Sequence, residues 1–219
     1  MTTQMKIQTS KPRISQDQAF QVFRRREKRL KTLLNMELLY APFWLMTYRY
    51  SAACGESKQS QMKAYRRFLS HLIKEAEPEQ PREKRITLVA DAVVGQIAFL
   101  RGDAEKMVEE EVDVEEDSVI GIAIPIDRVI GKAEVELKKR LLSTYMWKTK
   151  TFNLQLEGSQ IFYVPFWVGY YRVGREEKIQ VEVMNALSGE VGDSWHRGII
   201  EAGVLRMYQE TDGSNQRNI

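Results

Sequence analysis

Two segments, "YAPFWLMTYRY" from Tyr40 and "YVPFWVGYYRV" from Tyr163, are nearly the same aromatic phrase written twice, 123 residues apart. The identical residues in this alignment are Tyr40 and Tyr163, Pro42 and Pro165, Phe43 and Phe166, Trp44 and Trp167, Tyr48 and Tyr171, and Arg49 and Arg172. A second pair, "ITLVADAVVGQI" from Ile86 and "IQVEVMNALSGEV" from Ile179, aligns at an offset of 94. Because internal repetition dictates architecture, the sequence predicts a duplicated unit.

Both phrases alternate as β-strands do. In the second phrase Phe162, Val164, Phe166 and Val168 share one face of a strand, and Tyr163, Pro165, Trp167 and Tyr171 share the other. In the first, the two faces carry Leu39, Ala41, Phe43 and Leu45, and Tyr40, Pro42, Trp44, Met46 and Tyr48. Neither face is polar, so we expect a sheet that is covered on both sides, with a helix on one of them.

Turn signals follow the second pair of segments. Asp91 and Asn185 each precede a glycine, Gly95 or Gly189, that can adopt positive φ, which is typical of a hairpin. The "LEGSQ" segment from Leu156 predicts another turn, between "TFNLQL" and the second aromatic strand.

Each aromatic phrase is preceded by a helix signal. Ser15 followed by Gln18 forms a capping-box pattern. The apolar residues that recur at near-helical spacing are Phe20, Phe23, Leu30 and Leu34 in the first helix, and Ile130, Ala133, Leu137 and Leu141 in the second. A short helix is also expected in "GIIEAGVLRMY".

The predicted fold class is therefore α+β, with two tandem repeats related by a pseudo-twofold axis. Each repeat is expected to be a helix packed on an antiparallel sheet of about three or four strands. The expected organisation is a flexible N-terminus (1–13), a first repeat (14–102) with a helical insertion (51–85), an acidic linker (103–122), a second repeat (123–209) and a flexible C-terminus (210–219).

Composition places the chain among ordinary globular proteins. It has 219 residues, of which 43% are hydrophobic and 29% charged, and its net charge is +3. Residues 1–85 are net positive and the remainder is net negative. The polar start lacks the apolar core of a signal peptide, and no apolar run is long enough for a membrane span, so we expect a cytoplasmic protein. The single Cys54 excludes an intramolecular disulfide.

Motifs for catalysis or cofactor binding are weak. His71 and His196 are the two histidines and fall in different repeats, which argues against a histidine metal site. "GDSWH" brings Asp193, Ser194 and His196 together, but no nucleophile elbow surrounds the serine. There is no P-loop or dinucleotide fingerprint. We therefore predict no catalytic residue, metal or cofactor, and favour a noncatalytic protein.

The candidates for partner binding are basic and aromatic residues. "FRRREKRLK" concentrates positive charge at the first helix, and the insertion predicts an amphipathic helix with further cations. The candidate residues are Arg24, Arg25, Arg26, Arg29, Tyr65, Arg66, Arg67, Trp44, Trp167 and Tyr171. The tryptophans and Tyr171 would serve either as core between the repeats or as exposed anchors.

Each half resembles a PepSY-like module, a small cystatin-like α+β domain. The residues that carry the resemblance are Ile14, Ser15, Ala19, Asp91, Ala92 and Gly95 in the first half, and Ile126, Ala133, Asn185, Ala186, Gly189 and Glu190 in the second. The resemblance implies a noncatalytic binding or inhibitory module.

Our leading hypothesis is a protein-interaction or regulatory module, with another protein as partner and homo-oligomerisation left open. The first alternative is a nucleic-acid-binding protein that uses the basic first helix. The second is a small-molecule-binding protein or enzyme with a cavity between helix and sheet.

Overall fold

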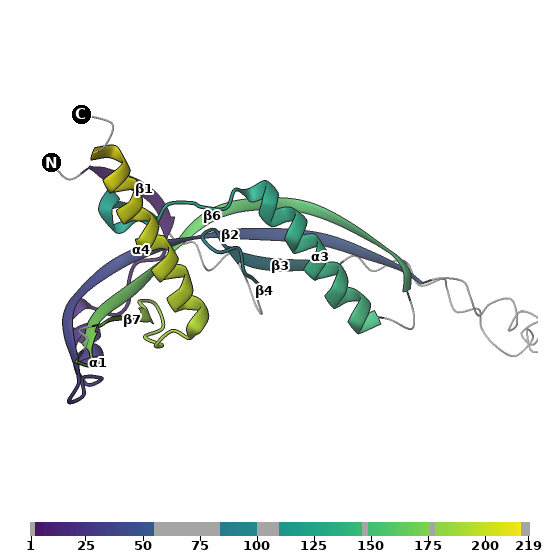
Figure 1. Ribbon diagram of the computed structural model, residues 1–219. Helices are drawn as coiled ribbons and strands as arrows, with labels where there is room; N and C mark the ends of the chain where they lie inside the picture. Colours follow the sequence, from purple (N-terminus) through teal and green to yellow (C-terminus); the bar gives the residue numbers. More distant parts are fainter. Residues whose placement is uncertain (1–2, 55–83, 100–109, 146–148, 176–177, 216–219) are drawn as a thin grey trace, which may run out of the picture.

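A computed structural model describes residues 3–54, 84–99, 110–145, 149–175 and 178–215, which form one mixed sheet of seven strands with three helices (Figure 1). The strands are β1 (Gln4–Thr9), β2 (Lys31–Cys54), β3 (Lys84–Asp91), β4 (Ile97–Phe99), β5 (Glu110–Glu115), β6 (Thr149–Val173) and β7 (Lys178–Asn185). The helices are α1 (Gln16–Arg24), α3 (Ile126–Tyr145) and α4 (Ser194–Asn215), and a single 3-10 turn, η2 (Glu116–Ser118), follows β5. The strand order is β4-β3-β2-β6-β1-β5, and β7 also pairs with β6.

The sheet is organised by β2 and β6, which run antiparallel along almost their whole lengths. Their pairing extends from Lys31 opposite Val173 to Cys54 opposite Thr149. At about 3.3 Å per residue these strands are roughly 80 Å long, and Figure 1 shows them curving through the entire molecule. The predicted fold class is therefore wrong: there is one large sheet, not two helix-on-sheet repeats. The two aromatic strands join edge to edge because this satisfies their backbone N–H and C=O groups in one ladder.

Helices also pack differently from the prediction. Phe23 of α1 is buried against Trp167 and Tyr171 of β6, on the strands that the second phrase builds. Leu137 of α3 is buried against Tyr48 of β2, on the strands of the first phrase. The buried strand residues beneath α1 and α3 therefore come from the other half of the sequence, while partly buried residues of the same half, such as Leu33 and Leu154, pack beside them. Two self-contained units would not pack in this way.

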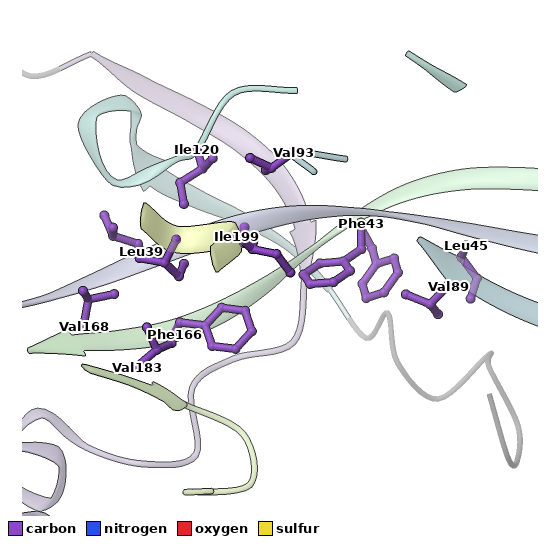
Figure 2. Packing of buried hydrophobic residues seen from close by; sticks show 13 residues of the cluster. Leu39, Phe43, Leu45, Val89, Val93, Ile120, Phe166, Val168, Val183 and Ile199 are labelled. Carbon is purple, nitrogen blue, oxygen red and sulfur yellow. The ribbon is translucent and has the colours of Figure 1, made fainter. Parts of the chain in front are cut away.

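The predicted division of the strand faces is confirmed. On one face, the cluster beneath α4 consists of Leu39, Ala41, Phe43, Leu45, Val89, Val93, Ile120, Phe162, Phe166, Val168, Val183, Ile199 and Ile200 (Figure 2). The opposite face is covered by α3 at one end, by α1 at the other and by the β1–β5 ribbon over Tyr40 and Tyr163 between them. Both faces are buried because neither carries the polar residues that a solvated face requires.

Both predicted turns form. Ala90 pairs with Ile97 across the first, which joins β3 to β4, and Met184 forms an isolated bridge with Val191 across the second. The strands that lead into these turns have equivalent registers with the aromatic strands, since Phe43 pairs with Asp91 and Phe166 pairs with Asn185. Gly95 and Gly189 have φ of 78° and 75°. Their positive φ explains why glycine stands at both turns.

Equivalent tryptophans fix both ends of the sheet. The Trp44 indole N–H donates to the Ile124 carbonyl at 3.0 Å, and the Trp167 indole N–H donates to the Ile14 carbonyl at 2.9 Å. Each contact ties an aromatic strand to the segment that leads into the helix covering it. Gene duplication as the origin of this correspondence stays a prediction.

Other expectations differ from the structure. The "LEGSQ" turn is absent because β6 continues through it, with a register shift where Gly158 and Leu156 face Thr47 and Tyr48. The first helix has the predicted Ser15–Gln18 capping box but ends at Arg24, so Leu34 lies in β2.

The segments expected to be flexible or to act as a linker contain regular structure. Residues 4–9 of the expected N-terminal tail form β1, and residues 110–115 of the expected acidic linker form β5, its antiparallel partner. Helix α4 reaches Asn215, beyond the expected end of the second repeat. The helical insertion falls almost wholly on residues 55–83, outside the described residues.

Candidate functional site

The start of α4 is fixed to the opposite half of the sheet by a buried carboxylate. Asp91 Oδ1 accepts backbone N–H groups from Val93, Val94 and Gly95 at 2.5–3.1 Å, and Oδ2 accepts that of Gln96 at 2.8 Å. Oδ2 also accepts the indole N–H of Trp195 at 3.2 Å. Asp91 is fully buried, and these five donors provide the partners that a buried carboxylate requires. They hold Trp195 at a defined place above the sheet.

Asp193 caps α4. Its Oδ1 accepts the N–H groups of Trp195 and His196 at 3.0 and 3.1 Å, and lies 2.9 Å from His196 Nδ1. The His196 backbone N–H is the largest influence that lowers the pKa of the Asp193 carboxyl. The predicted proximity of Asp193 and His196 is thus explained by a helix N-cap, which needs no catalytic role.

A cavity of about 440 Å³ lies where α4, the turn after β7 and the segment after β1 meet the sheet. Its lining combines aromatic and aliphatic side chains with a few polar ones: Ser10, Arg13, Phe43, Val89, Ala98, Phe162, Tyr163, Val164, Phe166, Asn185, Leu187, Ser188, Trp195 and His196. A volume of roughly 300–1,000 Å³ and a mainly apolar lining are typical of small-molecule sites.

Aromatic rings line the cavity on two sides. The centroid of the Phe43 ring lies 5.8 Å from that of Phe162 and 6.5 Å from that of Phe166. The three rings together form the floor of the cavity on the sheet. Trp195 meets Phe43 edge to face at 6.5 Å, and the His196 ring lies 5.5 Å from Phe166. Figure 2 shows Phe43 near the middle of the buried cluster, with Ile199 of α4 on one side and Val89 of β3 on the other.

The segment after β1 forms a wall that is fixed to the sheet. Thr9 is buried and its hydroxyl donates to the Tyr163 carbonyl at 2.7 Å. The N–H groups of Arg13 and Ile14 donate to the Ala186 carbonyl at 2.9 and 3.0 Å. Among the described residues that line the cavity, Arg13 is the only Lys, Arg, Asp or Glu, so the formal charge at its edge is positive.

A second hollow of similar volume, about 450 Å³, lies between β2 and the end of β5 with the η2 turn. Its border includes Glu37, Asp113, Glu115 and Asp117. Within the described ranges, no group of three or more His, Cys, Asp or Glu side chains is placed to hold a metal ion. Since the volumes are alike, the lining distinguishes the two hollows, and the aromatic one is the better candidate.

The aromatic candidates for partner binding belong to the core. Tyr171 is fully buried, and Trp167 is 7% exposed. Trp44 is half-buried and packs against the cluster beneath α3. Trp167 and Tyr171 therefore stabilise the sheet under α1 and are not accessible as exposed anchors, whereas Trp44 is partly covered under α3.

The remaining candidates differ in how the structure describes them. Arg26 pairs with the buried Glu182, with Nε and Oε2 2.5 Å apart. Arg24, Arg25 and Arg29 are exposed. Tyr65, Arg66 and Arg67 lie outside the described residues.

The sequence offers a cavity between helix and sheet as an alternative, but it does not locate one. Alternation places Phe43, Phe162 and Phe166 on one sheet face, yet the pattern does not indicate that α4 leaves space above them. Arg13, which lines the cavity, falls in the segment expected to be a flexible tail. The "DSW" pattern at Asp193, a helix N-cap beside a tryptophan, is the signal that could have located Trp195 at a helix start.

Comparisons with protein-family models, curated proteins and solved structures found no match to this chain. None of the helices in the described part of the chain combines the length and apolar character needed to cross a lipid bilayer. The function must therefore be inferred from the chemistry of the site itself.

Proposed function

We propose that this is a noncatalytic cytoplasmic protein that binds a small, planar, apolar molecule bearing an anionic group in the aromatic cavity beside α4. The observation that carries the proposal is a cavity of about 440 Å³ with aromatic rings on two sides. Arg13 supports the anionic group of the ligand, because it is a basic residue and the described residues that line the cavity include no other Lys, Arg, Asp or Glu.

Energetics favour an apolar occupant. Water in this cavity would face mostly rings and aliphatic groups, which offer it few hydrogen bonds. A ligand that removes apolar surface from water gains about 25 cal/mol per Å². The fixed positions of Trp195 and of the wall that carries Arg13 reduce the ordering cost on binding.

This proposal takes up the small-molecule alternative from the sequence. Recognition of another protein, the first expectation, stays a prediction. Trp167 and Tyr171, two of the rings named as its candidate anchors, are buried.

The test uses two fluorescent probes with the same ring system, 1-anilinonaphthalene-8-sulfonate and the uncharged N-phenyl-1-naphthylamine. We expect both to bind with one site per chain and to change the emission of Trp195. Arg13→Gln should weaken sulfonate binding about tenfold, or about 1.4 kcal/mol, and leave the uncharged probe within about twofold. Arg128→Gln is the matched control, since Arg128 is exposed on α3.

A cavity-filling variant tests the location. Val164 lines the cavity and is half-buried, so Val164→Phe should exclude both probes. Ser188→Trp, at the exposed rim, provides a second obstruction if Val164→Phe does not unfold cooperatively. Undiminished binding to a folded obstructed variant, or no probe binding by the native protein, would overturn the proposal.

A further inference from the structure

The basic end of the molecule is built from two turns that lie side by side. Lys28 and Lys31 exchange backbone hydrogen bonds of 3.0 and 2.9 Å, so Arg29 and Leu30 occupy the two central positions of a tight turn. The Gly174 N–H at the end of β6 donates to the Leu30 carbonyl at 2.8 Å. Figure 1 shows the loop between α1 and β2 protruding at one extremity of the molecule.

Some cations at this end have a structural role. Glu182 is 4% exposed and pairs with both Arg26 and Lys31. Lys31 Nζ also lies 4.2 Å from the centre of the Tyr171 ring. These contacts account for two of the positive charges and leave the others without an obvious role in the fold.

The remaining cations are exposed. They are Arg24, Arg25, Lys28 and Arg29 from the first turn and Arg175 from the second. From Arg24 to Lys31 the sequence contains six Lys or Arg residues and one Glu. The sequence adds Glu176 and Glu177 next to Arg175, so the excess positive charge comes from the first turn.

Apolar side chains are exposed among these charges. Leu30 is 60% exposed, Ile179 is 59% exposed and Phe20, beneath the Arg24 guanidinium, is 38% exposed. Ile179 pairs with Arg172, which pairs with Thr32 of β2, so it belongs to this end of the sheet. Tight hairpin turns favour Asn, Asp or Gly at their central positions. The turn itself therefore does not explain why Arg29 and Leu30 stand there.

We propose that this end, Phe20, Arg24, Arg25, Lys28–Leu30, Arg175 and Ile179, docks on the surface of an anionic lipid bilayer. The cations would meet the negative headgroups, and Leu30 at the protruding turn would enter the boundary between headgroups and acyl chains. A single-stranded nucleic acid fits less well, because it requires rings on which bases stack. Among the residues of this surface Phe20 is the only aromatic one and lies beneath the Arg24 guanidinium, and Leu30 and Ile179 are aliphatic.

Co-sedimentation with large unilamellar vesicles tests this docking. The vesicles contain phosphatidylcholine alone or with about one quarter phosphatidylserine, since anionic lipid sets the surface potential. We expect binding to the anionic vesicles that falls with salt and little binding to the neutral ones. Arg25→Glu with Arg29→Glu should lower the partition coefficient about a hundredfold, and Leu30→Ser about tenfold.

The matched control is Arg128→Glu with Arg206→Glu, an equal charge change at exposed positions of α3 and α4, which should leave binding within about twofold of the native value. If the charge reversal does not unfold cooperatively, Arg25→Gln with Arg29→Gln replaces it. The proposal is overturned if native protein does not bind the anionic vesicles at low salt, or if the folded charge variant binds like the native protein. It is also overturned if Leu30→Ser has no effect and a single-stranded oligonucleotide binds more tightly than the vesicles, because that result identifies a nucleic acid site.

Discussion

The two ends of the long sheet have equivalent strand registers, β3 on β2 and β7 on β6, but bury different side chains. Under α3, Tyr48 and Leu88 are fully buried, and the Tyr48 hydroxyl lacks a hydrogen-bond partner among the described residues. Under α1, the Tyr171 hydroxyl donates to the Phe23 carbonyl at 2.7 Å, and Glu182 stands where Leu88 stands at the other end. One backbone pattern therefore accommodates an apolar interior at one end and an ion-paired interior at the other.

Removing the Glu182 carboxylate is expected to have the largest effect on this comparison. Glu182→Ala leaves Lys31, whose side chain is 13% exposed, and Arg26 without their partner. We expect a loss of about 2–3 kcal/mol in the free energy of unfolding, measured by urea denaturation, because an unpaired buried charge is costly.

A double variant that copies the α3 end sharpens this result. Glu182→Leu with Lys31→Met places apolar groups where the ions were, and should recover most of the lost stability. Equal loss in the double variant and in Glu182→Ala would show that packing around Glu182, and not an unpaired charge, determines the effect.

The second prediction concerns pH. Burial raises the pKa of the Glu182 carboxyl, but Lys31 and Arg26 outweigh burial and hold this pKa below its ordinary value of 4.5. The stabilisation is therefore fully present above pH 4.5 and is lost as pH falls through the pKa of the folded protein. Between neutral pH and about pH 3 the native protein should lose more unfolding free energy than the Glu182→Leu, Lys31→Met variant. Identical slopes for the two proteins would contradict this assignment.

The smallest effects should come from the two equivalent tyrosines. Tyr171→Phe removes the donor to the Phe23 carbonyl and should cost about 1–2 kcal/mol. Tyr48→Phe removes a buried hydroxyl that has no partner within the described part of the chain, so stability should be unchanged or increase by up to about 1 kcal/mol. Thermal unfolding of both variants measures the difference, and a greater loss in Tyr48→Phe would mean that its hydroxyl has a partner.

The pKa values of the same two tyrosines also reflect their burial. Burial is the largest influence that raises the pKa of Tyr48, to about 12, and Glu134 adds to it. Burial likewise raises the pKa of Tyr171 well above its ordinary value. Both hydroxyls are therefore neutral at physiological pH, which fits their roles in packing.

Local signals predicted much of the local structure. Alternation at Phe162–Val168 assigned the strand faces, Asp91 and Gly95 indicated a hairpin, and Ser15 with Gln18 indicated a capped helix start. These features depend on interactions within a few residues, which a sequence pattern records directly.

Long-range features could not be predicted in the same way. The stripe through Ala133 and Leu137 shows that a helix has a buried face, but not which strands cover it. At Gly158 the turn-forming residues are outweighed by the continuous ladder with β2, because tertiary pairing overrides local preference. The cavity depends on where Trp195 meets Asp91, two residues 104 positions apart.

The packing of α1 on strands from the second half of the sequence affects folding during synthesis. Helix α1 leaves the ribosome early, yet the buried strand residues around Phe23 (Trp167, Tyr171 and Met184) belong to β6 and β7, near the other end of the chain. Translation proceeds at about 5–20 residues per second, so this helix must wait many seconds for these partners. We therefore expect the nascent chain to expose the apolar face of α1 until synthesis is nearly complete.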